Sequence, residues 1–194
     1  MPRVKTISDD QLLDSALDVL LEHGPQGFTL PEVGRAVGLS PSTLIQRFGS
    51  KRKLLDKVLD RATSRMEGEL ADRPRTGDPG RDLVSWLVGL TEPPRTRRQV
   101  AGNLTLLVED ITDDARRVSA ARHMQVMRDG IAAYLTALGS PSPQPHAAML
   151  EAHWHGLVIQ WAMTDVSVDL DAWVGDGLEA LVALLVPPES GPEG

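Results

Sequence analysis

The chain has 194 residues, 41% of them hydrophobic, and a formal net charge of −7, so it is long enough to bury one core or two smaller ones. It contains no cysteine, which excludes disulfides, thiolate metal sites and cysteine nucleophiles. No apolar run is long enough to span a membrane, and the polar N-terminal segment is unlike a secretion signal, so we expect a soluble cytoplasmic protein.

The first predicted helix begins at Ser8, where the residues Ser8-Asp9-Asp10-Gln11 form a capping box. Its apolar positions recur at helical spacing, and the segment His23-Gly24-Pro25 is expected to end it. Arg3 and Lys5 precede the cap. We expect them to form a disordered basic tail or, alternatively, an arm that reaches a polyanion.

Residues 28–55 (FTLPEVGRAVGLSPSTLIQRFGSKRKLL) predict two short helices joined by a tight turn. Thr29 can cap the first of them, and Pro31 fits its first turn. Gly38 suits a left-handed residue that ends this helix, while Ser40 is a good N-cap for the next. A helix, a short turn containing glycine and a second helix are typical of a helix-turn-helix motif.

The third helix of this region is predicted to begin with three cations, Lys51, Arg52 and Lys53. Positive charges at a helix N-terminus oppose the helix dipole, so a helix selected only for stability would carry Asp or Glu here. A solvated basic turn is the simple alternative. A nearby phosphate explains the placement better, because helix N-termini and basic side chains both bind anions.

Residues 8–66 resemble the N-terminal DNA-binding domain of the TetR family of transcriptional regulators, in Phe28-Thr29, Gly38-Leu39-Ser40, Ser42-Thr43-Leu44, Phe48-Gly49-Ser50-Lys51 and Leu54-Leu55. The resemblance implies that the second helix of the motif lies in the DNA major groove and that Lys51 contacts the backbone. Ile45 stands where the family usually has a tyrosine that contacts the DNA backbone. Gly34 stands where the family usually has alanine, and we expect it only to loosen its short helix.

The charge is divided unevenly along the chain. Residues 1–66 carry ten Lys and Arg against eight Asp and Glu, a balance of +2, and the remainder carries −9. This asymmetry favours an N-terminal module that meets a polyanion. We expect a helix-turn-helix domain at residues 1–50, a linking helix at 51–71, and an effector-binding and dimerisation domain at 72–194.

The C-terminal part shows helical periodicity and no sustained alternation, so we predict an all-α fold. Its last two helices, near 146–164 and 170–186, are apolar on more than one side, and helices of that kind must be covered on more than one side. Gly156, Gly175 and Gly177 suit the close approach of another helix. The resemblance implies that these helices form a homodimer interface; the alternative is the core of a monomer.

Candidate DNA-binding residues lie on the second helix of the motif and at the start of the next. They are Ser40, Pro41, Ser42, Thr43, Gln46, Arg47 and Lys51. Gln pairs bidentately with adenine and Arg with guanine, so Gln46 and Arg47 are expected to read bases. Thr43 and Lys51 are expected to hold phosphates.

A small-molecule site needs an apolar cavity with a few polar groups. Candidates in the middle and last helices are Trp86, Asn103, Met124, Met127, Trp154 and Trp161. Any of these apolar residues can equally belong to the core. The family resemblance implies an effector pocket in this part of the chain without identifying its occupant.

The sequence gives little support for a metal site or for catalysis. His146, Glu151, His153 and His155 cluster, but only Glu151 and His155 share a helix face, and zinc prefers three or four ligands. A helix-face pair of Glu151 with His155 is the expected alternative. No catalytic motif is present, so we expect neither an enzyme nor a cofactor.

The sequence therefore predicts a TetR-like regulator, best described as a repressor. It would bind a palindromic double-stranded DNA operator as a homodimer and leave it when an unknown small molecule binds the C-terminal part. Two alternatives remain open: an architectural DNA-binding protein without sequence preference or effector, and a helical interaction domain in which the basic turn is incidental.

Overall fold

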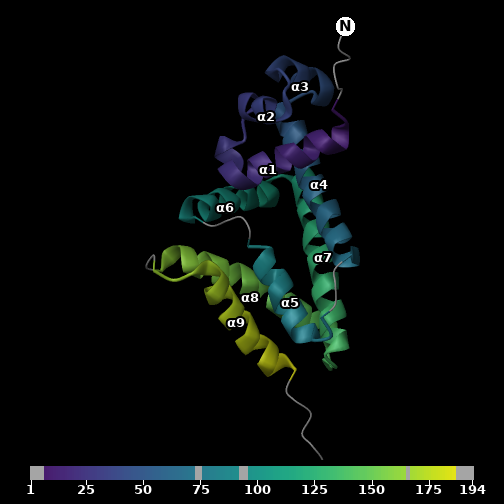
Figure 1. The fold of residues 1–194 in the computed structure, drawn as a ribbon, viewed down its shortest axis with the longest axis vertical. Coiled ribbons are helices and arrows are strands. Elements are labelled where there is room, and N and C mark those ends of the chain that lie inside the picture. Colours follow the sequence, from purple (N-terminus) through teal and green to yellow (C-terminus); the bar gives the residue numbers. More distant parts are fainter. Residues whose placement is uncertain (1–6, 73–75, 92–95, 165–166, 187–194) are drawn as a thin grey trace, which may run out of the picture. The chain divides into compact units, whose positions relative to one another are not determined.

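The computed structural model describes residues 7–72, 76–91, 96–164 and 167–186. Within these ranges it contains nine α-helices and no strand, which confirms the predicted all-α fold. The helices in Figure 1 are α1 (Asp9–Gly27), α2 (Leu30–Val37), α3 (Pro41–Phe48), α4 (Lys51–Asp72), α5 (Pro79–Gly89), α6 (Arg97–Thr112), α7 (Asp114–Ala137), α8 (Pro143–Met163) and α9 (Leu170–Leu185). Arg3 and Lys5 lie outside the described residues.

The helices form two compact units. Unit 1 comprises residues 1–68 and 101–123, and unit 2 comprises residues 69–100 and 124–194. Helices α4, α6 and α7 each continue from one unit into the other. The functional domain boundaries predicted near residues 50 and 71 remain predictions, because the two compact units reflect how the helices pack and not what each part does.

The core of unit 1 holds α1 to α4 together. Phe28, between α1 and α2, is fully buried with Leu12, Val33, Leu44 and Leu54, so each of the four helices contributes an apolar side chain to one cluster. Beyond this core, the first half of α7 lies along α4, where Thr63 Oγ1 is 3.0 Å from His123 Nδ1 (Figure 1). The shared core holds α2 and α3 against the start of α4.

Helix α1 begins as predicted but ends differently. Ser8 Oγ accepts a hydrogen bond from the Gln11 amide at 3.2 Å, and the Gln11 side chain accepts one from the Ser8 amide, which completes the capping box. The chain kinks at Gly24, whose φ of 67° is left-handed, and then continues helically to Gly27. The predicted end at residues 23–25 is therefore a kink, because Pro25 lies in the first turn of the segment after it and removes no hydrogen bond there.

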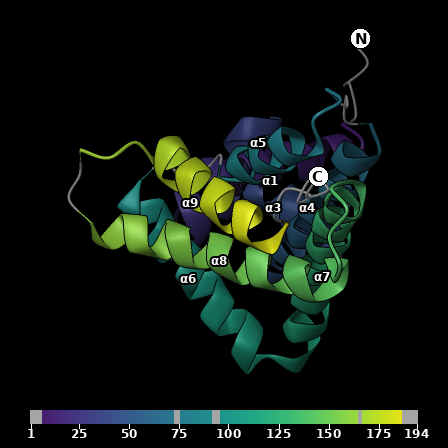
Figure 2. The ribbon, with the colours of Figure 1, turned by 90° about the horizontal axis from the view of Figure 1, so that it is seen from below.

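Unit 2 is built on α5, the second half of α7, and the antiparallel pair α8 and α9, which lie side by side in Figure 2. Leu87, Ile131, Leu150 and Leu178 are fully buried in its core. Gly177 explains how closely α8 and α9 approach, because a Cβ there would come within 2.6 Å of the Leu157 side chain.

The other two glycines expected to admit a neighbouring helix behave differently in the single chain. A Cβ at Gly156 would meet nothing within 4 Å, and one at Gly175 would only touch Val88 at 3.8 Å. Close approach within unit 2 therefore accounts for Gly177 and leaves Gly156 facing open space.

Candidate DNA-binding surface and ligand-binding region

Local hydrogen bonds build the turn between α2 and α3. Thr29 Oγ1 accepts the Glu32 amide at 3.3 Å and starts α2, and Gly38, with a φ of 70°, ends it in the left-handed conformation. Ser40 Oγ then accepts the Thr43 amide at 3.1 Å and starts α3. These caps and the left-handed glycine are those that the sequence predicts.

Gly34 has a more demanding role than the sequence suggested. The amide of Leu39 donates to the Gly34 carbonyl at 2.9 Å, and a Cβ at position 34 would lie 2.5 Å from the Leu39 carbonyl oxygen. The expectation that Gly34 only loosens α2 is wrong: its missing side chain makes room for the backbone that crosses from α2 to α3. The turn between the two helices therefore depends on this glycine.

Helix α3 has a buried face and an exposed face. Leu44 and Phe48 are buried in the core of unit 1, while Pro41, Ser42 and Gln46 are exposed. Ile45 is also partly exposed, so an apolar side chain interrupts this surface. The exposed polar side chains offer hydrogen-bond donors and acceptors of the kind that contact base edges and phosphates.

Four of the predicted contact residues already have partners within the chain. Ser40 Oγ lies 2.8 Å from both Ser42 Oγ and Thr43 Oγ1, in addition to capping α3. The Arg47 guanidinium forms an ion pair with Asp9 and donates to the Ile7 carbonyl at 3.0 Å. To bind a guanine, Arg47 would have to leave Asp9, whereas Gln46 is exposed without such a constraint.

The three cations at the start of α4 differ from one another. Arg52 forms an ion pair with Asp113, and that partner raises the pKa of Arg52, while the hydrogen bond from Arg52 lowers the pKa of Asp113. Lys51 is exposed, and in the described part of the chain Arg52 alone of the three is ion-paired. Ser50 Oγ caps α4 by accepting the Lys53 amide at 3.1 Å.

A charged cluster joins the first turns of α4 to the corner between α6 and α7, all within unit 1. The Arg116 side chain is only 6% exposed and lies 2.8 Å from Asp110, 3.2 Å from Glu109 and 3.6 Å from Asp56. Sequence reasoning missed Arg116, because its partners are on two other helices. The cluster ties α6 and α7 to the helix that begins at Lys51.

The six predicted ligand residues are divided between the two units. Asn103 is exposed on α6 in unit 1, and the other five lie in unit 2. Trp86 and Met127 are buried. Trp154 Nε1 donates to the Leu87 carbonyl at 2.8 Å, and Trp161 Nε1 donates to the Val168 carbonyl at 2.9 Å, so both indoles have structural partners.

Two further features of unit 2 were missed. A cavity of about 180 Å³ is lined by Leu70, Gly77, Pro79, Asp82, Gly130, Ala133, Tyr134 and Ala137, none of which is among the six predicted ligand residues. Separately, Arg128 on α7 pairs with the fully buried Glu151 on α8. A lone acid in the apolar segment AAMLEAHW was the available signal for this pair.

The histidines of α8 have partners other than a metal. His146 Nδ1 lies 2.7 Å from Ser140 Oγ, His153 Nε2 lies 3.2 Å from the Gly177 carbonyl, and His155 Nδ1 lies 2.9 Å from the Glu151 carbonyl. The expected Glu151–His155 side-chain pair is wrong, because the Glu151 carboxylate pairs with Arg128. No group of three possible metal ligands occurs among the described residues.

None of the helices, over the residues that the structure covers, is both long and apolar enough to cross a membrane.

Comparisons with known proteins agree on the class of protein. The family model described as "Bacterial regulatory proteins, tetR family" matches residues 12–58. The chain is 27% identical over 164 residues to the HTH-type transcriptional regulator BetI of Rhizobium meliloti (strain 1021), covering 68% of this chain and 80% of that one.

Two solved structures share the fold. A transcriptional regulator from Rhodococcus sp. Rha1 has a TM-score of 0.72 and 21% identity, with 92% of this chain and 96% of that chain covered. The transcriptional regulator FadR of Bacillus subtilis, solved in complex with stearoyl-CoA, has a TM-score of 0.57 and 17% identity, with 89% and 97% covered.

Proposed function

This chain is a transcriptional regulator of the TetR family, and from that premise we propose that it is a repressor that binds a palindromic operator as a homodimer and leaves it when a small molecule binds unit 2. The observation that carries the proposal is α3, a capped helix with a polar exposed face, followed directly by Lys51 at the start of α4. We place the regulator in the cytoplasm, where it would meet the operator.

On DNA, α3 would enter the major groove, with Gln46, Ser42 and Pro41 facing base edges. Lys51 would bind a phosphate together with the N-terminal amides of α4. Arg47 would read a base only after exchanging Asp9 for the DNA. These roles use the exposed face of α3 and leave its apolar face in the core.

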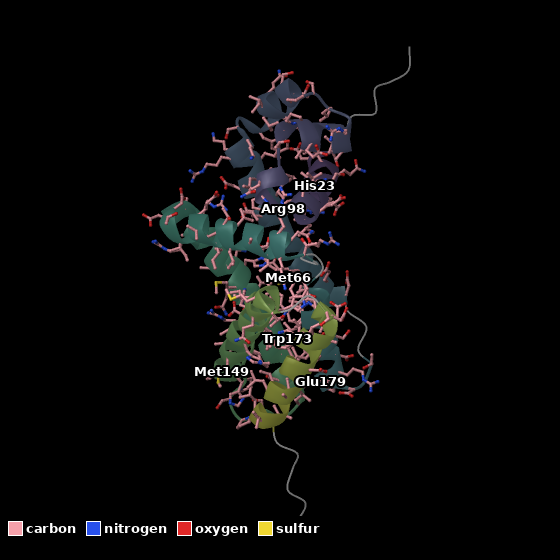
Figure 3. The ribbon with its side chains drawn as sticks, turned by 90° about the vertical axis from the view of Figure 1, so that its left-hand side faces the viewer. His23, Met66, Arg98, Met149, Trp173 and Glu179 are labelled. Carbon is pink, nitrogen blue, oxygen red and sulfur yellow. The ribbon has the colours of Figure 1, made fainter. Side chains whose placement is uncertain are left out.

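The homodimer would form through α8 and α9. Exposed or half-buried positions recur every three or four residues along α8, at Met149, Ala152, Gly156, Gln160 and Met163. Figure 3 labels Met149 on α8 and Glu179 on α9, and both side chains are exposed. A second copy would cover this apolar stripe, and Gly156 would let its helix come close.

The effector would act through α4. Arg116 and Asp113 hold the α6–α7 corner to Arg52 and Asp56, in the first two turns of α4. A ligand that favoured another arrangement of α7 would change the position of α4 and therefore of Lys51. It must bind the released state more tightly than the DNA-bound state, since otherwise it shifts no equilibrium.

The test is selection of bound sequences from a random duplex pool at physiological salt. We expect a palindrome whose half-sites match two copies of α3. Unenriched DNA would instead indicate an architectural DNA-binding protein, and no bound DNA would contradict DNA binding altogether. The same selection with Gln46→Ala should change the preferred bases, whereas Arg81→Ala, an exposed arginine of unit 2, should leave them unchanged.

A further inference from the structure

Glu151 is a buried carboxylate with one oxygen satisfied and one not. It is 0% exposed, on α8, and its Oε2 accepts a hydrogen bond from Arg128 Nε. Its Oε1 is buried and has no hydrogen-bond partner among the described residues. A buried acceptor without a donor is costly, so such an atom needs an explanation.

Residues typical of small-molecule sites lie near this pair along the same two helices. Met124 lies one helical turn before Arg128 on α7, and Met127 is its neighbour. Trp154 lies one turn after Glu151 on α8, with its indole N–H held by the Leu87 carbonyl. The Arg128–Glu151 pair therefore joins the two helices that carry Met and Trp residues singled out by the sequence for an apolar ligand.

The charges restrict the kind of ligand. Arg128 already neutralises Glu151, so a cationic ligand would meet the guanidinium as a like charge. An anionic ligand would likewise be repelled by the Glu151 carboxylate. What Oε1 requires is one hydrogen-bond donor without added charge.

Building on the proposed function, we propose that Glu151 Oε1 is the hydrogen-bond acceptor for the effector, and that the effector is an uncharged, mainly apolar molecule with one hydroxyl or N–H donor. Arg128 is then a positioning residue: it holds the carboxylate in one orientation through Oε2. Its side chain is 37% exposed, so the pair extends from solvent to the buried oxygen.

The experiment uses the full chain and a panel of para-alkylphenols, from methyl to hexyl, each with its matched para-alkylanisole, which lacks the O–H. Binding is followed by tryptophan fluorescence, and operator release by competition. We expect at least one phenol to bind about tenfold more tightly than its anisole, the factor that one hydrogen bond of ordinary strength provides. Para-alkylbenzoates and para-alkylbenzylammonium ions should bind more weakly than that phenol.

Two variants separate the acceptor from the fold. The double variant Arg128→Met with Glu151→Leu replaces a buried pair by apolar side chains, a change that proteins often tolerate. It should keep operator binding and lose the preference for phenol over anisole. Glu151→Gln keeps a carbonyl acceptor and should retain part of that preference.

Equal binding of each phenol and its anisole would overturn the inference, because Oε1 would then accept no hydrogen bond from the ligand. Binding of no probe by a preparation that binds operator would overturn it as well. A preparation that selects no operator even without probe would instead contradict the proposed function, and the phenol preference would still report on Glu151.

Discussion

Two helix pairs of this molecule, α2–α3 and α8–α9, differ in their exposed faces, and that difference indicates what each pair binds. Both pairs have an apolar inner face, with Leu44 buried on α3 and Leu150 on α8. Outside, α3 exposes Ser42 and Gln46, whereas α8 exposes Met149 and Met163. A polar outer face suits a hydrated polyanion, and an apolar one suits a second protein surface.

The largest effect is expected where a charge enters the apolar face of α8. Met149→Lys should convert the homodimer to monomers, because each interface would bury two unpaired ammonium groups. Sedimentation at micromolar protein would detect this as a halved mass, together with loss of palindrome binding. Ile111→Lys is the control, since Ile111 is an exposed apolar residue of unit 1 and should leave the dimer intact. An intact dimer with Met149→Lys would remove α8 from the proposed interface.

A glycine in each pair allows a closer comparison. Gly34→Ala should destabilise unit 1 by about 1–3 kcal/mol, because the new Cβ meets the backbone oxygen of Leu39, which cannot move alone. In Gly177→Ala the new Cβ meets the flexible side chain of Leu157. The better helix propensity of alanine, worth about 1 kcal/mol, offsets the cost of this crowding. Chemical denaturation of both variants measures the difference.

Gly68→Ala on α4 calibrates this comparison, since a Cβ there meets nothing within 4 Å and should stabilise the chain. If Gly34→Ala were as stable as Gly68→Ala, the close approach of Leu39 would have no energetic consequence.

The two pairs also differ in how well the sequence predicts them. The turn between α2 and α3 follows from Gly38 and Ser40, because caps and left-handed glycines act over three or four residues. Arg47 pairs with Asp9 and Arg128 with Glu151 over much longer separations, and no local pattern indicates which acid a basic residue will meet. The role of Gly34 was missed because the atom that excludes a side chain there, the Leu39 carbonyl oxygen, belongs to the next segment.

A smaller effect should distinguish the cations on the DNA side. Lys51→Ala should weaken binding to every DNA sequence and reduce the slope of log affinity against log salt by about 0.9, the share of one phosphate contact. Arg52→Ala is the matched control, because its guanidinium is committed to Asp113 and should contribute less to the slope. Titrations at several salt concentrations measure both. Equal slopes for Lys51→Ala and the unchanged protein would end the assignment of Lys51 to a phosphate.

The smallest expected effect is on the pH dependence of stability, and it comes from a single ion pair. Glu151 of unit 2 is buried, whereas one ion pair of unit 1 is partly exposed: Arg61 donates two hydrogen bonds to Asp14, at 2.6 and 2.8 Å. The hydrogen bond from Arg61 lowers the pKa of Asp14, so the pair stabilises the fold above the ordinary Asp pKa of about 3.9. That contribution should disappear as the pH falls through the lowered pKa of the folded state.

Asp14→Asn removes the titrating group, so the difference in unfolding free energy between the two proteins should be positive near neutrality and shrink towards zero below pH 4. Because the pair is partly exposed, added salt should reduce the difference at neutral pH. Asp18→Asn is the control, since Asp18 is more exposed and lies 3.8 Å from Arg65, a longer contact. A difference for Asp14→Asn that stayed constant from pH 7 to 3 would mean that the charge of the Asp14 carboxylate does not contribute to the stability of the fold.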